Sequence, residues 1–187
     1  MDRVSTGEAD PGAALASHAR RLGPGRALAL TSSAFAAGPG RARVAAAAAR
    51  LIADTLEVGC AIRWLVPTSR LPRVAVAHPS PTEQVWLRSL ARQDPMGIAG
   101  AFHVKVRQSR EPAMMSVIWS ALLRLWTSPA YWPYLEAHEI SGLLVLPLCA
   151  KASVVGVLTA WRERPLPAFA DDDLAFLEEV GRRLALC

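Results

Sequence analysis

The chain has 187 residues, of which 52% are hydrophobic and 20% are charged, and this composition excludes intrinsic disorder for most of its length. No apolar run approaches the ~20 residues that a membrane helix needs, the polar start Met1–Pro11 lacks the apolar core of a signal peptide, and three scattered cysteines exclude a disulfide scaffold. We therefore expect a cytoplasmic protein with no membrane partner.

The formal net charge of +5 is carried by arginines that are dispersed along the chain. A nucleic-acid-binding protein normally gathers its basic residues on one face, together with aromatic side chains or a reading helix. We therefore expect no nucleic-acid partner.

The first 40 residues differ from the rest of the chain. Residues 1–12 are polar, and the breakers Gly23-Pro24-Gly25 and Gly38-Pro39-Gly40 interrupt two short apolar stretches. We predict an N-terminal leader over residues 1–40, partly disordered or helical, and a domain over residues 41–187.

The domain opens with a predicted helix at Arg41–Glu57 and two predicted strands. The helix has an apolar stripe of period 3.6, formed by Val44, Ala48, Leu51, Ile52 and Thr55. The period then changes to two in Cys60–Val66, which places Arg63 on the face opposite the apolar residues. A turn at Pro67–Arg70 leads to a second strand, Leu71–Ala77, and the two strands should pair antiparallel.

A capping box predicts the next helix. Ser80 is a favoured N-cap, Pro81 suits the first helical position, and Glu83 stands three residues after Ser80. The helix should run to about Arg92, before Asp94-Pro95.

The middle of the chain is predicted to be irregular over residues 96–116, with short strands at Phe102–Arg107 and Pro112–Ser116. Helical patterns follow at Val117–Trp126 and Pro133–His138.

Two strong strands and a helix end the chain. Leu143–Leu148 and Ser153–Trp161 are rich in Val and Leu, as buried strands are, and the tight connector Cys149–Ala152 predicts antiparallel pairing. Asp171 is predicted to cap the last helix. The fold class is therefore α+β, with an antiparallel sheet of five or six strands and helices on both faces.

The order of these elements and three motifs resemble the GAF domain, a sensory family related to PAS domains. The motifs are Ser141–Leu148, Gly156-Val157-Leu158 and Phe169–Leu177; Gly97–Gly100 followed by Arg110-Glu111-Pro112 is similar to a further family segment, with Arg110 where the family has Gly. The resemblance implies a regulatory domain that binds a small molecule and relays its state through terminal helices. It also implies an output module, such as a kinase, phosphatase or cyclase, that is absent from this chain.

Aromatic residues gather in the part of the chain that covers the ligand pocket in GAF domains. Aromatic and Met side chains with a few polar groups suit a flat apolar ligand. The predicted pocket residues are Phe102, His103, Met114, Met115, Trp119, Trp126, Tyr131, Trp132 and Tyr134. The alternative is that these side chains are simply core and fill the pocket themselves, leaving a ligand-free dimerisation module.

The resemblance also implies a homodimer built on the first and last helices of the domain. Small residues on an exposed helix face allow close approach in a two-fold interface. The predicted interface residues are Ala45, Ala49, Ala53, Phe176 and Leu184.

No residue pattern indicates catalysis or a metal. The four histidines lack metal-ligand spacing, and no cysteine neighbours a histidine, as covalent bilin binding would need. A single histidine can bind haem iron, with His103 and His138 as the candidates, but a polar surface or loop histidine is the favoured interpretation. The cofactor is therefore unknown, with haem and bilin disfavoured. A free methionine sulfoxide reductase of GAF fold would need a reactive cysteine pair, whereas Cys60, Cys149 and Cys187 are far apart in sequence. We predict that the chain is not an enzyme and keep the reductase as a lesser alternative.

Overall fold

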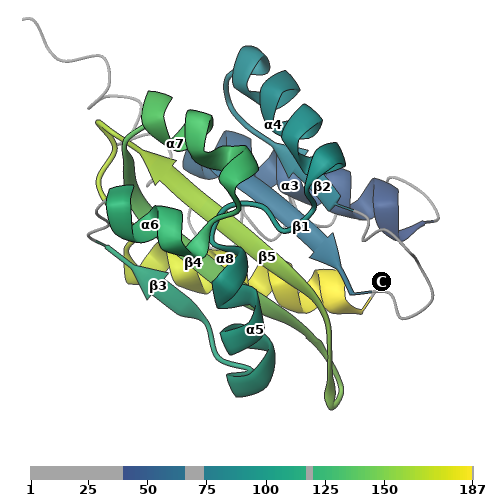
Figure 1. Ribbon diagram of the computed structural model, residues 1–187. Coiled ribbons are helices and arrows are strands. Elements are labelled where there is room, and N and C mark those ends of the chain that lie inside the picture. The colour runs from purple at the N-terminus through teal and green to yellow at the C-terminus, as the bar shows by residue number, and fades with distance from the viewer. Residues whose placement is uncertain (1–39, 66–73, 117–119, 187) are drawn as a thin grey trace, which may run out of the picture.

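The computed structural model describes residues 40–65, 74–116 and 120–186. Within these ranges five strands form one antiparallel sheet in the order β2-β1-β5-β4-β3 (Figure 1). The strands are β1 (Gly59–Trp64), β2 (Val74–Ala77), β3 (Ala113–Met115), β4 (Ile140–Ala150) and β5 (Ser153–Glu163). The predicted α+β class is confirmed.

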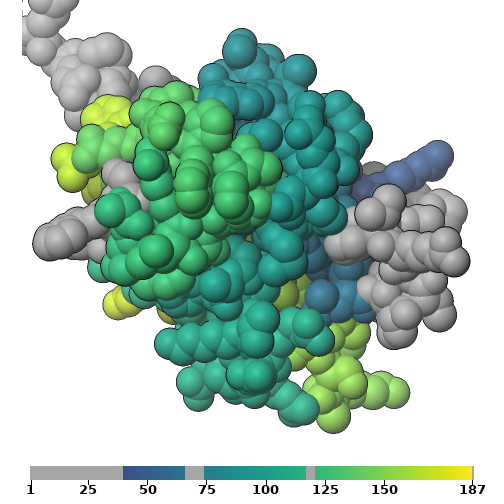
Figure 2. All heavy atoms as spheres, viewed as in Figure 1, coloured from purple at the N-terminus to yellow at the C-terminus, as the bar shows by residue number. Residues whose placement is uncertain are grey.

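Helices cover both faces of the sheet, as predicted. The helices α3 (Arg41–Leu56) and α8 (Asp171–Ala185) lie on one face. The opposite face is covered by four α-helices and a 3-10 turn, which fill the front of the space-filling view (Figure 2). They are α4 (Pro81–Gln93), α5 (Gly100–Ser109), α6 (Ser120–Trp126), η1 (Pro129–Tyr131) and α7 (Trp132–Ala137).

Each face of the sheet has its own apolar core. Strand alternation directs Ile62 and Leu158 toward α3 and α8, and Val157 and Trp161 toward the other helices. The central strands β1, β4 and β5 contribute to both cores. Side chains on the two faces are therefore connected through the same three strands.

The long hairpin of β4 and β5 is the centre of the sheet. Its antiparallel pairing is as predicted, and each strand is longer than predicted because pairing continues past the apolar runs, from Ile140↔Glu163 to Ala150↔Ser153. Beside it, Gly59 of β1 lies under the Trp161 ring, and a Cβ on Gly59 would come within 2.1 Å of that ring. Only glycine allows this approach.

The prediction of a strand at Phe102–Arg107 is wrong, because this segment belongs to helix α5. The alternation of Phe102, Val104 and Val106 resembles period two. In the structure Val106 is buried with His103, whereas Val104 is half exposed. The spacing of three residues between the two buried side chains is that of a helix.

Helix starts were predicted with mixed success. Ser80 caps α4 by accepting a hydrogen bond from the Glu83 N–H (3.4 Å). Asp171, by contrast, is the first residue of α8 rather than its cap. The N-cap residue is Ala170, and its N–H donates a hydrogen bond to the Asp173 carboxylate at 2.9 Å. A carboxylate three positions after the N-cap can reach back to this amide, which has no partner within the helix.

The leader predicted at residues 1–40, apart from Gly40, and the turn at Pro67–Arg70 lie outside the described residues. Among the helices that the structure describes, none is long and apolar enough to cross a membrane.

Candidate functional site

A small cavity lies between the sheet and the segment that connects α4 to α5. Its floor is formed by β1, β2 and β5, and its wall by Pro95–Ile98 and His103 of α5. The free volume is about 20 Å³, enough for roughly one water molecule. Most of the lining is apolar, and the lining side chains with N–H or O–H groups are Arg63, His103, Thr159, Tyr131 and Trp161.

Three of these polar side chains form a hydrogen-bonded chain across the cavity. The Nη1 of Arg63 on β1 lies 2.6 Å from Nδ1 of His103, and Nε2 of His103 lies 2.9 Å from Oγ1 of Thr159 on β5. A guanidinium has only donors, so Nδ1 must accept and Nε2 must carry the proton and donate to Thr159. All three residues are at least nine-tenths buried.

The electrostatics of this chain place one positive charge in an apolar environment. Burial, followed by the charge of Arg63, lowers the pKa of His103 to about 3, so the imidazole is neutral at physiological pH. Burial lowers the pKa of Arg63 to about 10, partly offset by Tyr131 and Asp94. Arg63 therefore keeps its charge at neutral pH.

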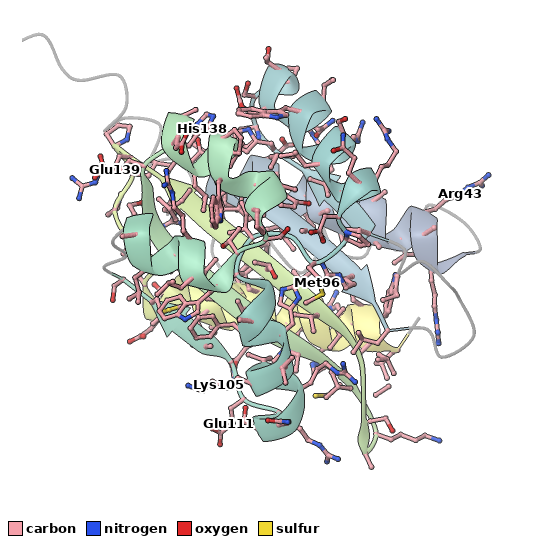
Figure 3. All side chains as sticks on the ribbon, in the orientation of Figure 1. Arg43, Met96, Lys105, Glu111, His138 and Glu139 are labelled. Atoms are coloured by element: carbon pink, nitrogen blue, oxygen red, sulfur yellow. The ribbon has the colours of Figure 1, made fainter. Side chains whose placement is uncertain are left out.

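The charge of Arg63 has no carboxylate partner within ion-pair distance among the described residues. Its Nη1 also contacts the Met96 sulfur at 3.8 Å, and its Nε has no hydrogen-bond partner. Asp94 attracts it electrostatically, but the Asp94 oxygens accept hydrogen bonds from the Met96 N–H (2.7 Å) and the Ser128 hydroxyl. Met96 is half exposed, lying over the sheet beside α5 (Figure 3).

Of the predicted pocket residues that the structure describes, two line the cavity, His103 and Tyr131. Trp126 packs edge-on against Phe102 with ring centroids 4.6 Å apart. Tyr134 is fully buried beneath the Trp161 indole, whose Nε1 donates to the tyrosine oxygen at 3.2 Å.

The remaining members of that set lie away from the cavity. Trp132 is partly exposed and donates from Nε1 to the Thr127 carbonyl at 3.2 Å. Met114 is also partly exposed, and Met115 packs on the core from the edge strand β3. Trp119 lies outside the described residues. Much of the aromatic cluster is therefore core or surface rather than pocket lining.

Four of the five predicted dimer residues are inside the domain, which corrects that prediction. Ala45, Ala49, Ala53 and Leu184 are each at most 1% exposed, because they pack in the core that α3 and α8 share with the sheet. Phe176 is partly buried against the same core. Small residues on α3 allow the helix to pack closely on its own sheet. This packing explains the alanines without a partner subunit.

Sequence reasoning missed Arg63 and Thr159 as members of a site. The period-two pattern of β1 already placed Arg63 opposite the apolar face. Because helices were expected on both faces of the sheet, that position had to be buried, and a buried arginine is unusual enough to mark a site. Nothing in the sequence connects it to His103, 40 residues away.

A second polar cluster closes the far end of the same face. Glu163 at the end of β5 accepts hydrogen bonds from Tyr134 and His78, and lies 3.1 Å from Nδ1 of His138. The other imidazole nitrogen of His138 lies 3.0 Å from Glu83. Burial raises the pKa of Glu163, but these hydrogen bonds and the histidine charges outweigh it, and the pKa lies below its ordinary value.

The two cysteines that the structure describes, Cys60 and Cys149, lie far apart. Cys60 is fully buried, and burial raises the pKa of its thiol, so it is a poor nucleophile. Cys60 pairs with Ala160 of β5, which pairs with Leu144 of β4. The exposed Cys149 lies about 17 Å farther along β4 from Leu144. Cys187 lies outside the described residues. In the described part of the chain, no group of three or more His, Cys, Asp and Glu residues could hold a metal ion.

Comparison with known proteins agrees with this fold. The chain is similar to the GAF domain of an Acinetobacter phosphoenolpyruvate-protein phosphotransferase (16% identity, 85% of this chain and 87% of that one, TM-score 0.58) and to a GAF domain/HD domain protein from Geobacter sulfurreducens (18%, 79% and 91%, 0.56). It is also similar to residues 122 to 287 of a methyl-accepting chemotaxis protein (14%, 84% and 93%, 0.60).

These identities establish a shared fold and nothing finer. No curated protein matches the chain. The model of the GAF domain family matches residues 41–187, which include all five strands of the described sheet, the cavity, and helices α3 and α8. The chain therefore belongs to the GAF domain family, whose members are sensory and regulatory domains of signalling proteins.

Proposed function

We propose that this GAF domain is an input domain that binds a small molecule in the cavity beside Arg63 and relays its presence through α3 and α8 to an output module. The output module is a kinase, phosphatase or cyclase on the same or another chain, and the working unit is a homodimer. The ligand acts by favouring one of two packings of the terminal helices.

One observation carries this proposal. Arg63 and Thr159 line the cavity on β1 and β5, while their neighbours Ile62 and Leu158 on the same strands pack against α3 and α8. Ile62 and Leu158 are directly paired. Adjacent residues of one strand thus face the cavity and the helices. A shift of β1 or β5 at the cavity therefore also moves the side chains that pack against α3 and α8.

Native mass spectrometry on untreated protein, beside a denatured control, tests the binding step. We expect extra mass that is lost on denaturation. A bare dimer would contradict the binding proposal for the protein as isolated and favour the second candidate below.

Hydrogen exchange tests the relay. Exchange in α3 and α8 should be slower in protein that retains the extra mass than in protein refolded after its removal. Equal exchange in both helices would contradict the relay even where binding is found.

A second candidate is a ligand-free dimerisation module with a self-filled pocket. It is favoured by the small free volume of about 20 Å³ and by the burial of Tyr134 and Trp161, which fill the space under α7. It predicts a bare dimer whose stability is unaffected by any small molecule.

The methionine sulfoxide reductase alternative is weakened by the positions of Cys60 and Cys149. Cys60→Ser and Cys149→Ser variants should retain the properties of the wild-type protein. Loss of a measurable reductase activity in either variant would revive this alternative.

A further inference from the structure

The buried guanidinium of Arg63 identifies the chemical class of the ligand. Arg162, the other arginine that is buried in the described part of the chain, has the Asp173 carboxylate at 3.1 Å. Among the described residues, Arg63 instead has a neutral imidazole and a thioether sulfur as its hydrogen-bond partners. A buried cation without an anion is costly, since neutral groups replace only part of its hydration.

The free donors of Arg63 lie on one edge of its guanidinium. Nη1 is used by His103 and Met96, and Nε has no partner. Nε and Nη2 share the edge that a planar oxyanion binds through two parallel hydrogen bonds. The Thr159 hydroxyl, which accepts from His103, keeps its own proton for donation.

The cavity that Arg63 lines sets the size of the ligand. The cavity accommodates little more than one water-sized group, and the remaining lining is mostly apolar. Met96, an unbranched side chain that is half exposed, contacts Arg63 beside the cavity and can move aside without disturbing a helix or strand.

From these contacts we propose that Arg63, His103 and Thr159 form a receptor for a small planar monovalent oxyanion, either the carboxylate of a short organic acid or nitrate. The anion accepts hydrogen bonds from the free edge of Arg63 and from Thr159. His103, held neutral between them, positions the guanidinium. This inference rests on the proposed input function and specifies what occupies its cavity.

Titration calorimetry on dialysed full-length protein tests the proposal with formate, acetate, nitrate and chloride. We expect saturable binding of at least one planar oxyanion and no comparable binding of chloride. Preference for formate or acetate identifies an organic acid, and preference for nitrate an inorganic ion. Binding of chloride as tight as that of every planar anion, or no binding of any probe, would overturn the proposal.

Two variants and a charge-matched control connect the binding to the site. Arg63→Gln should weaken binding at least 100-fold, and Thr159→Val, which keeps the side-chain shape, about tenfold. Arg88→Gln removes the same charge from the exposed face of α4 and should leave binding unchanged. Equal losses of affinity in Arg63→Gln and Arg88→Gln would overturn the proposed site. If Arg63→Gln fails to fold, an unchanged affinity in Thr159→Val would overturn it instead.

The thermal unfolding midpoint gives an independent measure. The preferred anion at ten times its Kd should raise the Tm of the wild type by about 3 to 6 °C and leave that of Arg63→Gln unchanged. These readouts are separate from those of the input function. If no anion binds, the anion proposal fails, and the input function is still tested by mass spectrometry and hydrogen exchange. If an anion binds but exchange in α3 and α8 does not change, only the relay is contradicted.

Discussion

At the residue scale, the pairing of Arg63 with His103 makes the domain sensitive to acid. The imidazole accepts from a guanidinium through one nitrogen and donates to Thr159 through the other. Protonation of the accepting nitrogen would place two buried positive charges 2.6 Å apart. Folding therefore requires the neutral ring.

The resulting prediction concerns stability between pH 6.5 and pH 4. The pKa of His103 is about 3 in the folded protein and about 6.5 in an unfolded chain, so below pH 6.5 the unfolded state binds a proton that the folded state does not. The free energy of unfolding should fall with decreasing pH, by at most about 1.4 kcal/mol per unit. In His103→Gln, which retains one donor and one acceptor, this dependence should be reduced.

Urea unfolding at a series of pH values measures the effect, with pH 7.5 as the reference for both proteins. Parallel pH profiles in the wild type and His103→Gln would contradict the assigned role of the ring. Glu163, whose pKa is depressed, contributes stability that is lost only near and below pH 4.3, so the two effects occupy different pH ranges.

At the scale of elements, the start of α8 depends on one carboxylate of three. Asp173 bonds the Ala170 amide and forms an ion pair with Arg162, whose guanidinium lies over the Phe169 ring at 4.6 Å. Asp172 is exposed in the same first turn. Both carboxylates interact favourably with the helix dipole, and only Asp173 neutralises a buried charge.

We predict that Asp173→Ala lowers the free energy of unfolding by about 3 kcal/mol, since it leaves Arg162 buried without its anion. The matched control Asp172→Ala should cost at most about 0.5 kcal/mol, the contribution of the helix dipole at an exposed site. Denaturant titration of both variants gives the comparison. Similar losses in the two would mean that the helix dipole, and not the ion pair, is the important interaction.

At the scale of the whole molecule, two apolar cores share one sheet. The side chain of Leu158 points toward α3 and α8, and that of its neighbour Val157 toward the opposite helices. Neither core is complete without β1, β4 and β5. Loss of one core should therefore destabilise the other.

We predict that Leu158→Ala lowers the free energy of unfolding by about 2 to 5 kcal/mol while unfolding remains a single transition. Far-ultraviolet circular dichroism reports the helices, and tryptophan fluorescence includes Trp161 on the opposite face. The two transitions should coincide. A fluorescence transition that stays at the wild-type midpoint would indicate that the cores unfold independently, and would weaken the proposed relay.

The sequence by itself determined the features that depend on neighbouring residues. The change from period 3.6 to period two located α3 and β1, the tight connector predicted the β4–β5 hairpin, and Ser80 marked the start of α4. These follow from local geometry, because a helix or strand with one apolar face has few ways to bury it.

Only the tertiary structure decided which faces meet. Val104 and Val106 fit a strand as well as a helix until the sheet buries one of them, and an alanine stripe suits a partner subunit as well as its own sheet. Arg63, His103 and Thr159 come from three elements, separated by 40 and 56 residues. Their charge and hydrogen bonds become strong interactions only when packing excludes water from between them. That packing brings together segments that no local sequence pattern connects.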